Sequence, residues 1–144
     1  MPERFKTRRV TGWLVCAYLL TATMLFAIDR DGLIGTWEGE SKCTVPNSPC
    51  HDEHVIYEVV GDRRKTDIFK MDGYKVVEGK QRELMGSLDC TLGVASSTLT
   101  CTGHSEKQDL WEFKIAEGRM VGTLVVGAEK QLFRKITVEK HEAK

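Results

Sequence analysis

The sequence predicts an all-β protein, a single antiparallel up-and-down β-barrel of eight or nine strands that follows an N-terminal hydrophobic segment. Beyond residue 27, apolar and polar residues alternate over most of the chain, as in strands with one buried face. Turn signals recur about every 8–12 residues, which leaves no room for crossover helices, so neighbouring strands pair antiparallel. A meander of this many strands usually closes, because closure removes its edges. A two-sheet sandwich is the alternative.

The first 27 residues differ from the rest of the chain. Four basic residues and one acidic residue give a net charge of +3 before residue 10, and residues 10–27 carry no charge. This order is typical of a secretory signal peptide that is cleaved after Ala27, with Ala22 as the second choice. The alternative is an uncleaved membrane anchor over residues 10–27. In both cases we expect residues 28–144 to form one exported domain, periplasmic or secreted.

Four cysteines remain once this segment is set aside, and an even number in a small exported domain predicts disulfides. A hairpin around Ala95-Ser96 places Cys90 opposite Cys101, at a separation that a disulfide can span. We therefore prefer the pairs Cys90–Cys101 and Cys43–Cys50. Zinc is the competing interpretation of four cysteines, but neither spacing is of the CxxC kind.

The first four strand segments are justified by alternation, composition and one turn. Residues 33–43 place Trp37 on one face and Glu38 and Glu40 on the other, and residues 54–60 are rich in β-branched and aromatic side chains. Residues 65–71 and 74–77 flank Asp72-Gly73. Asp-Gly between apolar runs predicts a two-residue hairpin turn, since both positions need positive φ.

The later segments follow the same rules. Residues 83–92 place Leu84 and Leu88 on one side, and residues 98–102 form the partner strand of that hairpin. In residues 111–115, aromatic and aliphatic side chains alternate with Glu112 and Lys114. Turns at 117–118 and 127–128 bound a strand over residues 120–126 and lead into the last one, over residues 131–138.

The first and last strands carry residues that indicate a family. Gly35-Thr36-Trp37 lies on the first strand, and Arg134 lies between apolar residues on the last. These strands are neighbours in a closed meander, so the Arg134 guanidinium can stack on the Trp37 indole and satisfy its charge. This pattern resembles the calycin superfamily, the lipocalins and their small relatives, which keep a Gly-x-Trp on the first strand and an arginine on the last. The resemblance implies a barrel closed by Gly35, Trp37 and Arg134.

The chain departs from that family in three respects: it is shorter than a typical lipocalin, it lacks a clear second lipocalin motif, and no helix follows the barrel. Residues 35–57, with Cys43, Cys50 and Asp52-Glu53, also resemble small exported bacterial proteins of unknown function. That second likeness favours export and implies no activity.

The inward faces supply the candidate ligand site. We expect these faces to present Trp37, Tyr57, Phe69, Leu88, Trp111 and Phe113. Glycines on the same faces either permit sharp coiling or leave space. A small barrel is filled by its own side chains or has room for one small ligand, and sequence leaves both open. The expected function is non-catalytic binding of a small apolar ligand, without a cofactor.

Other functions find less support in the sequence. His51 and His54 are weak metal candidates, because an extended chain directs them to opposite faces. No acid, base and nucleophile share a spacing that predicts an enzyme. Zero net charge and the absence of a binding motif argue against nucleic acid as a partner. The alternative function is that of a protein-interaction module, such as a hydrolase inhibitor, acting through the proline-bearing Cys43–Cys50 loop. We expect a monomer that contacts a membrane only through its N-terminal segment.

Overall fold

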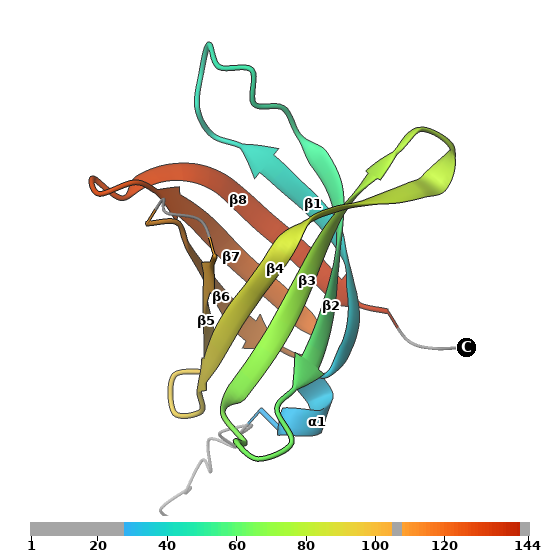
Figure 1. The fold of residues 1–144 in the computed structure, drawn as a ribbon, viewed down its shortest axis with the longest axis vertical. Coiled ribbons are helices and arrows are strands. Elements are labelled where there is room, and N and C mark those ends of the chain that lie inside the picture. The colour runs from blue at the N-terminus through green and yellow to red at the C-terminus, as the bar shows by residue number, and fades with distance from the viewer. Residues whose placement is uncertain (1–27, 105–107, 142–144) are drawn as a thin grey trace, which may run out of the picture.

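Strand alternation produces a closed barrel in the computed structural model, which describes residues 28–104 and 108–141 (Figure 1). A short helix and eight strands follow one another: α1 Arg30–Leu33, β1 Gly35–Cys43, β2 Glu53–Gly61, β3 Ile68–Val77, β4 Gln81–Gly93, β5 Thr98–Gly103, β6 Leu110–Ala116, β7 Arg119–Val126 and β8 Gln131–Lys140. Between β3 and β4 lies the 3-10 turn Glu78–Lys80. The predicted all-β, up-and-down barrel is confirmed. The predicted signal peptide or anchor lies outside the described residues.

Every strand pairs antiparallel with the next, and β8 pairs with β1 to close the sheet. The β1–β2, β3–β4, β5–β6 and β7–β8 connections gather at one end, which we call the open end. Helix α1 and the other three connections lie at the opposite end, which we call the sealed end (Figure 1). Among the described residues, no helix is long and apolar enough to span a membrane.

The sealed end is closed by α1 and the side chains beneath it. Leu33 and Trp37 are buried, and the indole Nε1 donates a 2.9 Å hydrogen bond to the Leu33 carbonyl. Lys140, at the end of β8, donates to the Gly32 carbonyl at 2.5 Å, and its Nζ lies 5.8 Å from the centre of the Trp37 ring. A cation therefore ties the last strand to the carbonyl end of the helix and to the indole.

The expected stacking of Arg134 on Trp37 is wrong. In the β1–β8 register Trp37 faces Lys140, whereas Arg134 faces Cys43, six residues further along β1 and near the open end. At about 3.3 Å per residue, that places the two side chains roughly 20 Å apart. Lys140 takes the position over the indole that the family resemblance assigned to Arg134.

The expected hairpin turn at Asp72-Gly73 is also wrong, because β3 runs through both residues as one continuous strand. Gly73 is buried, and a Cβ there would come within 3.1 Å of Cε1 of Tyr57. The glycine therefore makes room for the packing of Tyr57 on the neighbouring strand. The segments 65–71 and 74–77, expected as two strands, are replaced by the single strand β3. The chain turns later, at residues 78–80.

Both predicted disulfides are present, Cys43–Cys50 in the β1–β2 connection and Cys90–Cys101 between β4 and β5. The predicted register of the second hairpin, with Cys90 opposite Cys101, is confirmed. Two disulfides in a small domain indicate a non-reducing compartment.

Candidate functional site

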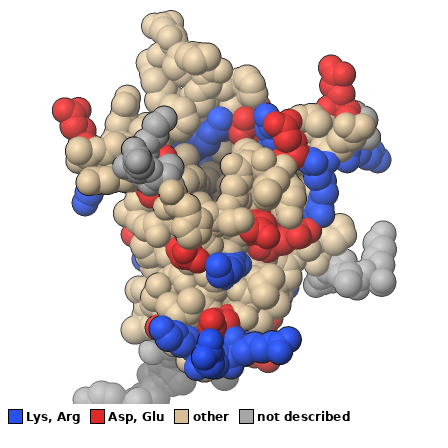
Figure 2. All heavy atoms as spheres, viewed as in Figure 1, with Lys and Arg blue, Asp and Glu red and all other residues tan. Residues whose placement is uncertain are grey.

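The open end of the barrel holds a pocket of about 420 Å³. Residues from all eight strands and from the β5–β6 connection line it: Ser41, Glu53, Tyr57, Gly73, Met85, Gly86, Ser87, Leu88, Gly103, His104, Asp109, Trp111, Leu124 and Arg134. In Figure 2 the surface is hollowed between the loops of the open end, with basic and acidic side chains around the hollow. The volume lies within the range of small-molecule sites, roughly 300–1,000 Å³.

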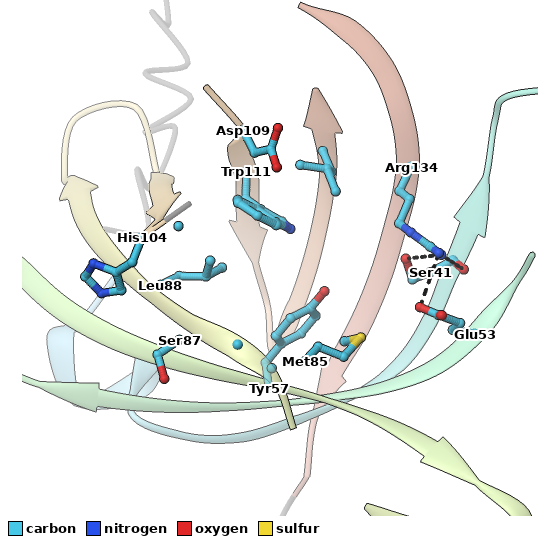
Figure 3. Close-up of a pocket in the computed structure, with 14 residues that line it drawn as sticks. Ser41, Glu53, Tyr57, Met85, Ser87, Leu88, His104, Asp109, Trp111 and Arg134 are labelled. Atoms are coloured by element: carbon cyan, nitrogen blue, oxygen red, sulfur yellow. Dashed lines mark hydrogen bonds and ion pairs between the residues drawn. The ribbon is translucent and has the colours of Figure 1, made fainter. Parts of the chain in front are cut away.

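One wall of the pocket is apolar. Trp111 of β6, Leu88 of β4 and Leu124 of β7 contribute to it, and Figure 3 shows the first two. The Trp111 ring lies against Gly103 of β5, where a Cβ would come within 3.4 Å of the indole carbon Cζ3. The absence of a side chain at Gly103 thus lets the indole approach the neighbouring strand closely.

The opposite wall is polar and centres on Arg134 of β8. One guanidinium nitrogen, Nη2, lies 3.3 Å from Oε2 of Glu53, and these side chains are only 13% and 16% exposed. The other, Nη1, donates to the carbonyl and hydroxyl oxygens of Ser41, both at 3.3 Å, and to the carbonyl of His51 at 3.2 Å. Figure 3 shows Arg134, Ser41 and Glu53 converging at this side. The ion pair thereby fastens β8 to β1 and β2.

Tyr57 forms the floor of the pocket. Its ring meets Phe113 edge-on at 5.7 Å between centroids, and Gly73 leaves the space that the ring occupies. Burial raises the pKa of Tyr57 well above its ordinary value. The phenol therefore stays protonated at neutral pH, and Figure 3 shows its hydroxyl turned into the pocket.

Asp109 immediately precedes β6, two residues before Trp111, and lies above its indole in Figure 3. Its Oδ1 oxygen is buried and has no hydrogen-bond partner among the described residues. A buried carboxylate oxygen without a donor is costly, and such atoms are rare in folded proteins.

A β-bulge between β3 and β4 supplies Met85. Gly73 pairs with Gly86 and Tyr74 pairs with Leu84, so Met85 has no partner in the register. The extra residue turns Met85 to the pocket, whereas Leu84, expected to face inward, is 56% exposed.

The pocket contains half of the predicted ligand-binding residues. Tyr57, Leu88 and Trp111 line it. Trp37, Phe69 and Phe113 are buried in the core nearer the sealed end and do not reach it. The sequence did not predict four polar residues of the pocket, nor Met85 at the bulge. The polar residues are Ser41, Glu53, Asp109 and Arg134, the last of which was expected to stack on Trp37 instead. Alternation offered a signal for two of them, because Glu53 and Asp109 lie at even spacing from Tyr57 and Trp111.

The two metal candidates face different carboxylates. His54 Nε2 lies 2.7 Å from Oε1 of Glu38 on the outer face of the barrel, and His51 Nδ1 lies 4.0 Å from Oε1 of Glu53. No group of three or more metal-ligating side chains occurs within residues 28–104 and 108–141.

At the sealed end, residues 63–65 are exposed in a basic loop, and Figure 2 shows basic side chains gathered there.

Fold and site together define a class, the small closed antiparallel β-barrels with a half-polar pocket at one end, and this class is compatible with a calycin-like fold. A comparison with protein-family models found no match, and neither did a comparison with curated proteins.

Proposed function

We propose that the protein binds a small, mainly apolar organic molecule in the pocket at the open end and carries out no reaction on it. The observation that supports this most directly is the pocket itself, about 420 Å³ between an indole wall and a hydrogen-bonding wall. Ligand sites commonly combine apolar walls with a few fixed polar groups.

The pocket walls are preformed, which favours binding over simple packing. Arg134 is held by three other residues, and Tyr57 is wedged between Gly73 and Phe113. Fixed walls lower the ordering cost of association.

The arrangement of nucleophiles and bases gives catalysis less support. Ser87 Oγ donates to Oδ1 of Asp72 at 2.5 Å, and His104 Nε2 lies 3.3 Å from Oδ2 of Asp89. Each of these groups contacts a carboxylate, and within the described residues no hydrogen bond joins the serine to the histidine as nucleophile and base.

The proposed setting is outside the cytoplasm, periplasmic or secreted, as for a calycin-like binding protein. The two disulfides and the basic-then-apolar order of residues 1–27 support export. A chain anchored through residues 10–27 would place the same domain on the same side of the membrane.

Paired tryptophan substitutions on β4 test the proposal. Both side chains are exposed, Met85 at 45% and Leu84 at 56%, but only Met85 lines the pocket. We expect the full chain to bind phenylnaphthylamine, a neutral apolar fluorophore, saturably. Met85→Trp should weaken that binding at least about tenfold by filling the mouth, and Leu84→Trp should leave it unchanged. Absence of saturable binding by the unmodified chain, or equal weakening in both variants, would contradict the function.

A second candidate, a hydrolase inhibitor, is favoured by the Cys43–Cys50 loop alone. This loop projects from the open end in Figure 1 and is braced by Ser48, whose hydroxyl donates to the Val45 carbonyl at 3.2 Å and accepts from the Cys50 amide at 3.1 Å. Inhibition of an exported protease or lysozyme by the full chain, lost in the Cys43→Ser/Cys50→Ser double variant, would support it. No inhibition of any such enzyme would remove it.

A further inference from the structure

We propose that the ligand carries a cationic amine, which pairs with Asp109 and lies against Trp111. This inference rests on the proposed function and names the chemical class of its ligand. It starts from the buried Oδ1 of Asp109, which has no donor among the described residues although it belongs to a pocket wall. An acceptor of this kind is satisfied when a ligand supplies the donor.

The charge of the acceptor selects the donor. Asp109 is a carboxylate, so a hydrogen bond from an ammonium group is charge-assisted and stronger than one from a neutral hydroxyl. A neutral donor would satisfy the geometry of Oδ1 but would leave the negative charge uncompensated.

The indole next to Asp109 favours the same group. Trp111 of β6 follows Asp109 by two residues, and both side chains face the pocket in Figure 3. Tryptophan is the aromatic side chain that attracts cations most strongly, and a partly desolvated site strengthens that attraction. A cation held by Asp109 would therefore also lie near the best cation-attracting surface of the pocket.

The remaining charges of the lining disfavour an anion. Arg134 is the basic residue that an acidic ligand would need, but Glu53 already neutralises it at 3.3 Å, and Ser41 and the His51 carbonyl accept hydrogen bonds from its Nη1. His104 is mostly exposed and lies beside Asp89. With Glu53 and Asp109 against Arg134, the lining carries one net negative charge when His104 is neutral.

The experiment compares three probes of one shape. Naphthylethylamine, naphthylethanol and naphthylacetate share an aromatic body that fits the apolar wall and are cationic, neutral and anionic at neutral pH. Their affinities for the full chain are measured by calorimetry at low and at physiological salt. We expect the ammonium probe to bind about tenfold more tightly than the alcohol, and the carboxylate to bind least.

Two isosteric variants locate the effect. Asp109→Asn removes the proposed partner while keeping the shape of the side chain, and we expect it to abolish the roughly tenfold preference for the ammonium while leaving the alcohol unchanged. Glu129→Gln is the matched control, because it removes the same charge from an exposed turn at the open end that does not line the pocket. It should keep the preference.

Each outcome decides between the two proposals. Tight binding of the alcohol with no preference for the ammonium, or a preference that survives in Asp109→Asn, would overturn the cationic ligand class and leave the binding function standing. If phenylnaphthylamine and all three probes fail to bind, both proposals are overturned together.

Discussion

At the scale of single residues, Asp109 affects two properties in opposite ways: it lowers the stability of the ligand-free protein, and it offers an acceptor to a ligand. Its buried Oδ1 has no donor among the residues that the structure describes, which lowers the stability of the folded chain, and a bound donor removes that penalty. Residues that break a local rule of this kind tend to be found at functional sites. Stability and binding should therefore respond in opposite directions to a change at this position.

The first prediction is that Asp109→Asn stabilises the ligand-free protein. Replacing the carboxylate with an uncharged amide lowers the penalty of burial, and we expect the free energy of unfolding to rise by about 1 kcal/mol. Urea denaturation of both proteins without ligand measures this difference. Glu129→Gln, in an exposed turn, should change little. A less stable Asp109→Asn protein would show that the carboxylate has a donor in the empty state.

A second residue-scale prediction concerns alkaline pH. Burial raises the pKa of Tyr57 above its ordinary value of 10.0, so the folded state holds the phenolic proton more tightly than the unfolded chain does. The resulting stability is complete below pH 10.0 and is lost progressively as the pH rises above that value. Urea unfolding between about pH 8 and pH 11 should show a steeper decline for the unmodified protein than for Tyr57→Phe. Parallel declines would contradict the assignment to Tyr57.

At the scale of elements, the seam between β1 and β8 depends on a close approach at Gly39. A Cβ at this position would overlap the carbonyl oxygen of Thr137 and lie 2.8 Å from Cα of Val138. Backbone atoms cannot move aside as the end of a flexible side chain can. The glycine is thus a condition for the strand pairing that closes the barrel.

The corresponding prediction is that Gly39→Ala destabilises the barrel by about 2–3 kcal/mol, because β8 must shift away from β1. Gly32→Ala is the control, since a Cβ on exposed Gly32 of α1 meets nothing within 4 Å. That substitution should be neutral or slightly stabilising. Denaturant unfolding measures both, and amide exchange along β8 should accelerate in Gly39→Ala alone. Equal stability of the two variants would show that the seam tolerates a side chain.

Sequence patterns predicted the barrel and both disulfides because alternation and residue counting act locally, as in the Cys90–Cys101 hairpin. Asp72-Gly73 has the composition of a turn. Gly73 instead leaves room for the Tyr57 ring on the neighbouring strand, and local composition carries no information about such a contact between strands. Arg134 was singled out from the sequence as a charge between apolar residues, and the structure surrounds it with polar partners. Its partner depended on the β1–β8 register, which no pattern within either strand specifies. The bulge at Met85 escaped prediction for the same reason.

At the scale of the whole molecule, the two disulfides restrain different parts. Cys90 and Cys101 are buried in the core, whereas Cys43–Cys50 closes a loop of the open end. Their sequence separations of 11 and 7 residues imply similar restraint of the unfolded chain, about 2–3 kcal/mol each.

We predict that replacing Cys90 and Cys101 with serine costs more stability than replacing Cys43 and Cys50, because the first pair also contributes to core packing. Urea unfolding compares the two double variants. The Cys43→Ser/Cys50→Ser protein should instead lose affinity for pocket probes, because the His51 carbonyl that positions Arg134 follows this loop directly. Equal stability of the two double variants would show that the core gains nothing from Cys90–Cys101.

Both ends of the described chain lie at the sealed end. Ile28 borders the surface around Gly118, and the Lys140 amide donates to the Gly118 carbonyl at 2.8 Å. A tether attached at either position would therefore hold the barrel by its base, with the mouth facing away from the support. The domain could be immobilised on a sensor or fused to a second protein from either side without obstructing ligand entry. Joining the two ends and reopening the chain in a connection of the open end would give a circular permutant whose new termini flank the mouth.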